Sequence, residues 1–398
     1  MRPRRLLLVA GAVLALLAVF VAGVVVGGHP QATGLTRLSE PLRGLVLGDS
    51  GQDLSAQVLD VLERSYYEPI DVEELEQTSV EALIEALDDP YTVYLDPEEL
   101  EALRQRNDGA YYGVGLQVAQ RGNQLVVTRV FEGGPAADAG IRAGDRLVSV
   151  AGRPTGGQTL EQVVSRIRGP EGTEVVLGIA ARGGARRELE LTRERIKVPA
   201  VDSRLETTGD VKVGYVRLSQ FTRGAAGALR AAVEGVREKG AQALVLDLRG
   251  DPGGLVDEAV GVAGAFLPDG APVVVTEGLH SPRRTFRTDG APVAGDLPLI
   301  VLVDRGSASA SEIVAGALRD AGRGRLVGER TFGKALVQST RLLRDGGALK
   351  VTTARYLTPD GFDLATRGLP PSVKVVDDPE TQPDEALRRA LGLAAAEA

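Results

Sequence analysis

Apolar and polar residues follow several different patterns along the chain, and each pattern predicts a different kind of structure. Residues 6–26 carry no charged or strongly polar side chain. Residues 54–104 place apolar side chains at helical spacing, and residues 111–193 form short strand patterns separated by glycine turns. From about residue 197, short apolar strands alternate with helices, as in a βαβ arrangement. We therefore expect a mixed α/β protein with several domains.

The amino-terminal segment predicts a membrane anchor. Arg2, Arg4 and Arg5 precede the apolar residues 6–26, a stretch of 21 residues that is long enough to cross a bilayer. The arginines are expected to stay in the cytoplasm, which places most of the protein outside it, on a single-pass anchor in residues 1–28. A cleaved signal peptide is the alternative, because Val21-Ala22-Gly23 matches a small-residue cleavage site.

The remaining boundaries follow from changes in pattern. We expect a linker at 29–51, a helical region at 52–106, a β-rich domain at 107–195, a βαβ domain at 196–380 and a carboxyl-terminal helix at 381–398. The last helix is rich in Ala and Leu. We interpret its apolar side as a contact with a second copy of the chain, which would make a homo-oligomer.

One serine lies where a nucleophile would be effective. The apolar run 299–303 predicts a buried strand, and a helical pattern begins shortly after it. Ser309 lies in the turn between them, where the free N–H groups of the first helical turn face a developing oxyanion. The alternative is that Ser309 and Glu312 form an S-x-x-E capping box that only starts the helix.

Composition limits the chemistry that such a serine can use. The chain has no Cys and two His, of which His29 ends the hydrophobic segment, so His280 is the sole soluble candidate. A Ser-His-Asp triad is barely available, and Cys- or His-based metal sites are excluded or nearly so. We expect neither a metal nor another cofactor. The formal net charge of −8 also argues against nucleic acid as a partner.

The base for Ser309 is then expected to be a lysine. Lys334 follows a glycine and precedes a strand pattern, and Gln338 faces the same way as Lys334 in a strand or in a helix. A lysine base must be neutral, which burial favours. Gln338 can orient the amine without adding negative charge. The alternative is an ordinary surface lysine.

Three motifs together resemble those of the carboxyl-terminal processing serine peptidases, also called tail-specific proteases. They are G-S-A-S-A-S-E at 306–312, A-G-A-L-R-D at 315–320 and T-F-G-K at 331–334 with Gln338. The resemblance implies a crotonase- or ClpP-like catalytic domain in which Ser309 is the nucleophile, Lys334 the general base and Gln338 its partner. It also implies an oxyanion hole formed by Ala310 with Gly253 or Gly254.

The β-rich domain resembles a PDZ domain. This resemblance assigns to four residues the loop that binds a terminal carboxylate, namely Gly113, Val114, Gly115 and Leu116. The implied partners are protein substrates with apolar or unstructured carboxyl termini. A glycine-rich turn without a ligand is the alternative.

Three residues depart from the family pattern. Asp251 stands where the family commonly has Asn, Ala335 where it has Gly, and Ser372 where it has Asp. Together these observations predict a membrane-anchored serine endopeptidase that works outside the cytoplasm. Two other functions stay open: a catalytically silent PDZ adaptor and a crotonase-like acyl-CoA enzyme.

Overall fold

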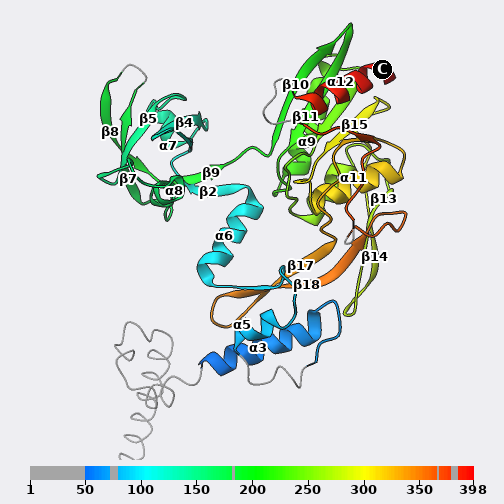
Figure 1. Ribbon diagram of the computed structural model, residues 1–398, viewed down its shortest axis with the longest axis horizontal. Helices are drawn as coiled ribbons and strands as arrows, with labels where there is room; N and C mark the ends of the chain where they lie inside the picture. The colour runs from blue at the N-terminus through cyan, green and yellow to red at the C-terminus, as the bar shows by residue number, and fades with distance from the viewer. Residues whose placement is uncertain (1–49, 72–78, 182–183, 365–366, 378–383) are drawn as a thin grey trace, which may run out of the picture. The chain divides into compact units, whose positions relative to one another are not determined.

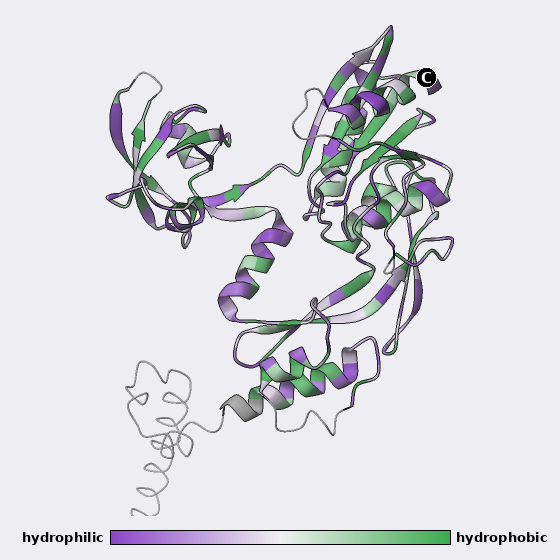
Figure 2. Ribbon diagram, viewed as in Figure 1, coloured by the Kyte–Doolittle hydropathy of each residue, from purple (hydrophilic) through white to green (hydrophobic). Residues whose placement is uncertain are grey.

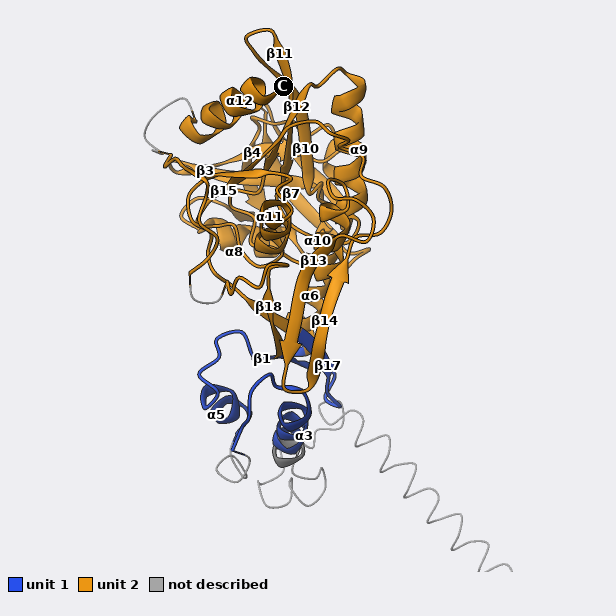
Figure 3. Cartoon of the chain, turned by 90° about the vertical axis from the view of Figure 1, so that its right-hand side faces the viewer, with its two compact units in different colours: residues 1–96, 339–351 blue, residues 97–338, 352–398 orange. Residues whose placement is uncertain are grey.

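The computed structural model describes residues 50–71, 79–181, 184–364, 367–377 and 384–398. The predicted anchor and nearly all of the predicted linker lie outside these residues. No helix in the described part of the chain is long and apolar enough to span a membrane. The chain divides into two compact units, residues 1–96 with 339–351 and residues 97–338 with 352–398 (Figure 3).

The first unit packs two helices on a short antiparallel ladder. Helices α3 (Ser50–Ser65) and α5 (Val80–Glu85) contribute apolar faces, and strand β1 (Val93–Leu95) pairs with the first residues of β18 (Ala348–Leu357). The buried side chains of this unit include Val58, Leu62, Leu83, Leu349 and Val351. The helices were predicted. Strand β1 was missed, because three residues are too few to show a period of two.

The second unit begins with helix α6 (Pro97–Asp108) and then contains the predicted PDZ-like module. Strands β2 (Ala110–Gly113) and β9 (Glu194–Lys197) pair at its base. Its sheet has the order β3-β4-β5-β7-β8, with β6 (Arg153–Pro154) paired to β5. The sheet strands are β3 (Leu116–Arg121), β4 (Gln124–Val130), β5 (Arg146–Val150), β7 (Glu174–Ala180) and β8 (Arg186–Thr192).

The edge of this sheet suits an extended peptide. Strand β3 lies at the edge and follows the predicted loop, in which Gly115 has a φ of 80°. Besides the one-turn helix α7 (Pro135–Asp138), the module has helix α8 (Leu160–Ile167), which begins at a capping box of Thr159 and Gln162. Val163 of α8 is buried in the core of the module, and Leu160 and Val164 pack against that core. An unpaired strand edge can bind a further strand, so peptide binding at β3 stays a prediction that the topology allows.

The catalytic-type domain is built on a six-stranded sheet of order β10-β11-β12-β15-β16-β19. All neighbours are parallel except β10, which is antiparallel to β11. The strands are β10 (Val201–Thr208), β11 (Val211–Leu218), β12 (Ala243–Asp247), β15 (Leu299–Val303), β16 (Arg325–Gly328) and β19 (Val373–Lys374). Helices α9 (Ala225–Glu238), α10 (Val256–Ala263) and α11 (Ala310–Asp320) cover one face (Figure 1).

Helix α12 (Glu385–Glu397) covers the opposite face of the same sheet. Its Ala386, Ala390 and Ala394 are buried in one cluster with strand residues that include Val245 and Ile300. The central strands β12 and β15 are buried at every position and are apolar apart from Asp247 (Figure 2), because helices cover both faces of the sheet. The prediction that this apolar side contacts another subunit is therefore wrong, since the side packs on its own sheet.

A second ladder in the same unit was predicted only in part. Strands β13 (Pro272–Gly278) and β14 (Ser281–Arg287) form an antiparallel hairpin, and the last residues of β18 pair with β13. The sequence predicted β18 and the preceding β17 (Leu336–Leu342), but not the hairpin. His280 lies exposed in the hairpin turn.

Candidate active site

Ser309 occupies a strained turn between β15 and α11. Its φ of 54° and ψ of −114° place it in the left-handed half of backbone space, which few residues other than glycine adopt. Such a conformation costs roughly 1–3 kcal/mol and persists only where surrounding contacts enforce it. A strained strand-to-helix turn also exposes a nucleophilic hydroxyl above the sheet. An ordinary helix N-cap does not need this positive φ, because N-cap residues usually have extended backbone.

Glu312 connects the Ser309 turn to the Lys334 turn. This side chain is 0% exposed. Its Oε2 accepts hydrogen bonds from the backbone N–H groups of Ser309 and Lys334, both at 2.9 Å. Its Oε1 accepts from Gly333 N at 2.8 Å and from the hydroxyl of Thr331. Burial raises the pKa of Glu312, although these four donors oppose the rise.

The backbone of Lys334 is fixed from the carbonyl side as well. The Tyr356 hydroxyl of β18 donates to Lys334 O, and Tyr356 N donates to Ala335 O at 2.8 Å. Ala335 is buried. Lys334 itself is half-buried in the loop that precedes β17. Ala335, where the family has Gly, is therefore buried in this loop beside Tyr356.

Gln338 has a different partner from the one that its spacing suggested. Gln338 Nε2 lies 3.4 Å from Thr352 Oγ1, within the second unit, and donates a long hydrogen bond to it. Thr352 is buried. The amide of Gln338 is thus oriented by β18, and its predicted action on Lys334 stays a prediction.

Gly253 brings the turn after β12 into contact with the Ser309 turn. Gly253 has a φ of 94°, and a Cβ at this position would lie 2.8 Å from Ala310 N and 2.9 Å from Ser309 Cβ. Only glycine fits such an approach. The Gly253 N–H donates to Asp251 Oδ1 at 2.8 Å. Among the described residues, the N–H groups of Gly254 and Ala310 have no acceptor, so they are the better candidates for an oxyanion hole.

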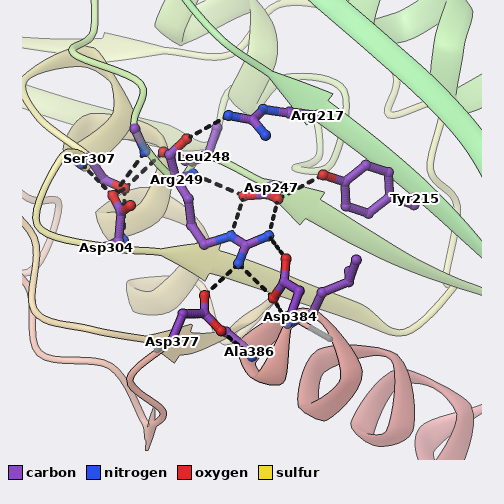
Figure 4. Close-up of polar contacts among 12 residues, drawn as sticks. Tyr215, Arg217, Asp247, Leu248, Arg249, Asp304, Ser307, Asp377, Asp384 and Ala386 are labelled. Atoms are coloured by element: carbon purple, nitrogen blue, oxygen red, sulfur yellow. Dashed lines mark hydrogen bonds and ion pairs between the residues drawn. The ribbon is translucent and has the colours of Figure 1, made fainter. Parts of the chain in front are cut away.

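Asp304 and Ser307 fasten the same two turns together (Figure 4). Asp304 Oδ1 accepts from Gly250 N and Gly306 N, both at 2.9 Å, and from Ser307 N at 3.0 Å. The Ser307 hydroxyl donates to Leu248 O at 2.8 Å. These bonds hold the candidate oxyanion turn and the nucleophile turn as one rigid piece.

Arg249 connects this piece to α12 (Figure 4). Its guanidinium is paired with Asp247 at 2.7 Å, Asp377 at 2.8 Å and Asp384 at 2.9 Å. Asp384 also caps α12 by accepting from Leu387 N. The pairing at Asp247 is completed from β11, whose Tyr215 hydroxyl donates to it at 2.7 Å. Burial and then Asp247 raise the pKa of Tyr215 to about 12, so this hydroxyl stays a donor.

Sequence reasoning singled out Ser309, Lys334 and the glycine turn as candidates, but missed the residues that hold their backbones in place. Glu312 was considered only as a helix cap, and Asp304, Arg249 and Tyr356 were not singled out. The signal that the sequence offered was the acidic residue three positions after Ser309. Its contact with Lys334 is visible only in the structure. In the described part of the chain, no group of three or more His, Cys, Asp or Glu side chains is arranged to hold a metal ion.

Comparison with known proteins decides the family. A model of peptidase family S41 matches residues 212–375, a PDZ-domain model matches 126–181, and a model of the activating protease CtpB N-terminal domain matches 51–99. The solved photosystem II D1 C-terminal processing protease is 34% identical, with a TM-score of 0.55, and 86% of this chain aligns with 97% of that one. The chain belongs to peptidase family S41. Within this family, a probable CtpA-like serine protease of Staphylococcus aureus (strain N315) is 36% identical over 326 residues.

The relatives differ from this S41 chain in length and in sequence. The match covers 82% of the chain but 64% of the Staphylococcus aureus protein, so this chain spans less than two thirds of that relative. A putative S41 protease from Bacteroides fragilis shares the fold, with a TM-score of 0.57 at 15% identity. The resemblance to carboxyl-terminal processing peptidases that the motifs indicated is confirmed.

Replacing Glu312 with Gln is expected to lower kcat by about 10- to 100-fold while changing KM little. A glutamine has one acceptor oxygen where the carboxylate has two. Its NH₂ group therefore faces either the N–H groups of Ser309 and Lys334, or the Gly333 N–H and the Thr331 hydroxyl, and one of these pairs of donors loses its acceptor. Small displacements of catalytic groups reduce rates by such factors. Steady-state kinetics on an unfolded substrate would measure this. Glu329→Gln is the matched control, because the Glu329 carboxylate pairs with the exposed Arg305 at 2.9 Å. A loss equal to that of Glu312→Gln would contradict the role of Glu312.

Proposed function

We propose that this S41 protein is a serine endopeptidase that cuts proteins near their carboxyl termini by a Ser-Lys mechanism. The observation that carries the proposal is the strained Ser309, whose backbone shares the buried carboxylate of Glu312 with the backbone of Lys334. A helix start needs only the first of these contacts. Joining the serine to a lysine 25 positions later serves to hold a nucleophile and a base in one geometry.

The proposed steps assign a role to each group. Ser309 Oγ attacks the scissile carbonyl, and neutral Lys334 takes the hydroxyl proton. The oxyanion of the tetrahedral intermediate accepts hydrogen bonds from Gly254 N and Ala310 N. Lys334 then returns the proton to the leaving amine, and water hydrolyses the acyl-enzyme by the same route. Gln338 orients Lys334 while remaining bonded to β18.

The substrate is proposed to be an unstructured or apolar protein carboxyl terminus. Support comes from the PDZ-like module, where the loop Gly113, Val114, Gly115 and Leu116 leads into the unpaired edge of β3. The N–H groups of such a loop bind a terminal carboxylate, and the strand edge pairs with the residues before it. The apolar residues 6–26 support a membrane anchor with the catalytic part outside the cytoplasm.

The proposal is tested by trapping and by cleavage. Full-length protein in detergent is incubated with an unfolded protein that bears an apolar carboxyl terminus, and the products are mapped by mass spectrometry. In parallel, an acylating or phosphonylating reagent is added and the modified residue is located. We expect carboxyl-terminal fragments, and an adduct on Ser309 rather than Ser307 or Ser311.

The same assay separates the alternatives. Peptide binding without cleavage or adduct would indicate a PDZ adaptor. Binding of an acyl-CoA thioester in place of a peptide would indicate a crotonase-like enzyme. An adduct on another serine would contradict the proposed nucleophile.

A further inference from the structure

Asp251 is a buried acid inside the candidate oxyanion turn. The residue is 0% exposed. Its Oδ1 accepts from Gly253 N at 2.8 Å, while its buried Oδ2 has no hydrogen-bond partner in the described part of the chain. Its backbone carbonyl accepts from Ala308 N at 3.0 Å and from the Ser311 hydroxyl at 2.9 Å. Asp251 therefore touches both the glycine that borders the oxyanion site and the turn that carries Ser309.

The groups around Asp251 do not offset the cost of burying its negative charge. Burial raises the pKa of Asp251 to about 7 and outweighs the Gly253 N–H, the Ser311 hydroxyl and Arg217 of β11, which all favour the ionised form. The other ionic groups of the packed turns have their own partners. Asp304 and Glu312 accept backbone N–H groups, and Arg249 is paired with three aspartates. At neutral pH, both forms of Asp251 are thus populated.

We propose that Asp251 is a positioning residue for the oxyanion hole that supports catalysis while neutral and opposes it once ionised. This inference rests on the proposed function. A neutral carboxyl holds the Gly253 peptide through Oδ1 in the same way as the amide of an asparagine would. An ionised carboxyl adds a buried negative charge beside Gly253, whose Cα borders Ser309 Cβ and Ala310 N. That charge repels the oxyanion as it forms, because it is poorly screened in the protein interior.

The experiment compares Asp251→Asn with the wild type across pH. Asparagine keeps the acceptor for Gly253 N and cannot ionise. The quantity measured is the ratio of kcat/KM of the variant to that of the wild type, from about pH 5.5 to about pH 9. Titration of Lys334 affects both proteins and largely cancels in this ratio. We expect a ratio near one at the acidic end that rises through neutral pH to about tenfold or more at the alkaline end.

Two further variants separate charge from position. Asp251→Ala removes the acceptor as well as the charge, so its kcat is expected to be about tenfold lower than that of Asp251→Asn at every pH, with similar KM. Asp269→Asn is the matched control, since the exposed Asp269 also accepts a backbone N–H, from Gly290 at 2.9 Å. Its ratio to the wild type is expected to be flat.

The outcomes distinguish this inference from the proposed function. An active wild type with a flat Asp251→Asn ratio overturns the role of Asp251 and leaves the peptidase standing. An inactive wild type contradicts the peptidase itself. If Asp251→Asn does not fold, carbon-13 NMR of aspartate carboxyls in the wild type gives a second test. A carboxyl that titrates near pH 7 supports the inference, and the absence of any between about pH 6 and about pH 8 overturns it.

Discussion

Replacing Ser309 with Ala is expected to lower kcat/KM for an unfolded protein substrate by about 10⁴-fold or more. The variant loses the hydroxyl that is proposed to form the acyl-enzyme, while the candidate oxyanion N–H groups and the edge of β3 remain. The substitution leaves the backbone bond from Ser309 N to Glu312 in place. Cleavage rates are measured by mass spectrometry. Thermal unfolding and peptide affinity, measured in parallel, would show that the inactive variant is still folded and still binds substrate.

The neighbouring serines are the matched controls for this variant. Ser307 donates to Leu248 O and Ser311 donates to Asp251 O, so their hydroxyls join turns and are not free to attack. Alanine at either position is expected to lower the free energy of unfolding by about 1–3 kcal/mol and activity by about tenfold at most. Retention of more than about one per cent of activity by Ser309→Ala would rule out Ser309 as nucleophile.

Replacing Lys334 with Met is expected to lower kcat by about 10³- to 10⁴-fold. Methionine keeps the length and the apolar stem but has no amine to accept the serine proton. The backbone contacts of residue 334, to Glu312 and from Tyr356, do not depend on the side chain, so the loop is expected to keep its conformation. The measurement is single-turnover cleavage, which isolates the acylation step.

Lys334→Arg distinguishes a base from a fixed cation. Arginine keeps the positive charge and cannot be deprotonated in a protein, so a base role predicts an arginine variant as inactive as Lys334→Met. Substantial activity in Lys334→Arg would show that residue 334 acts by its charge. The double variant Ser309→Ala, Lys334→Met is expected to be no slower than Ser309→Ala alone, because the two side chains act as one unit.

The sequence predicted the elements that have a strong local pattern. The apolar run 299–303 and the S-x-x-E start of α11 are both visible within a few residues, and the structure contains each of them. The nucleophile turn could be placed for the same reason. By contrast, β1 and β13 pair with β18, a strand far along the chain, and β14 is a mostly polar edge strand that pairs only with β13, so none of the three shows a strong local pattern.

The supporting residues could not be found from sequence, because their roles depend on distant partners. From sequence, Glu312 is only a helix cap, whereas in the structure the oxygen that accepts from Ser309 N also accepts from Lys334 N. From sequence, Asp251 is only a conservative replacement of the Asn that is common in the family. Its burial and its unpaired oxygen are known only from the structure. The apolar side of α12 indicated that another surface covers it. The sequence did not indicate that this surface is the sheet of the same domain. The spacing of apolar residues shows that one face of a helix is buried, but it does not show what that face packs against.

The position of Arg249 in the chain has a consequence for the order in which the site is completed during synthesis. Two of its acidic partners, Asp377 and Asp384, follow it by 128 and 135 positions. Residues 250 to 334, which carry the glycine turn, Ser309 and Lys334, are therefore all translated before either of these two partners. Until α12 docks, this guanidinium keeps Asp247 as its partner while the other two acids are still missing. The ion-pair network around Arg249 can therefore be complete only after residue 384 has been translated and α12 has packed on the sheet.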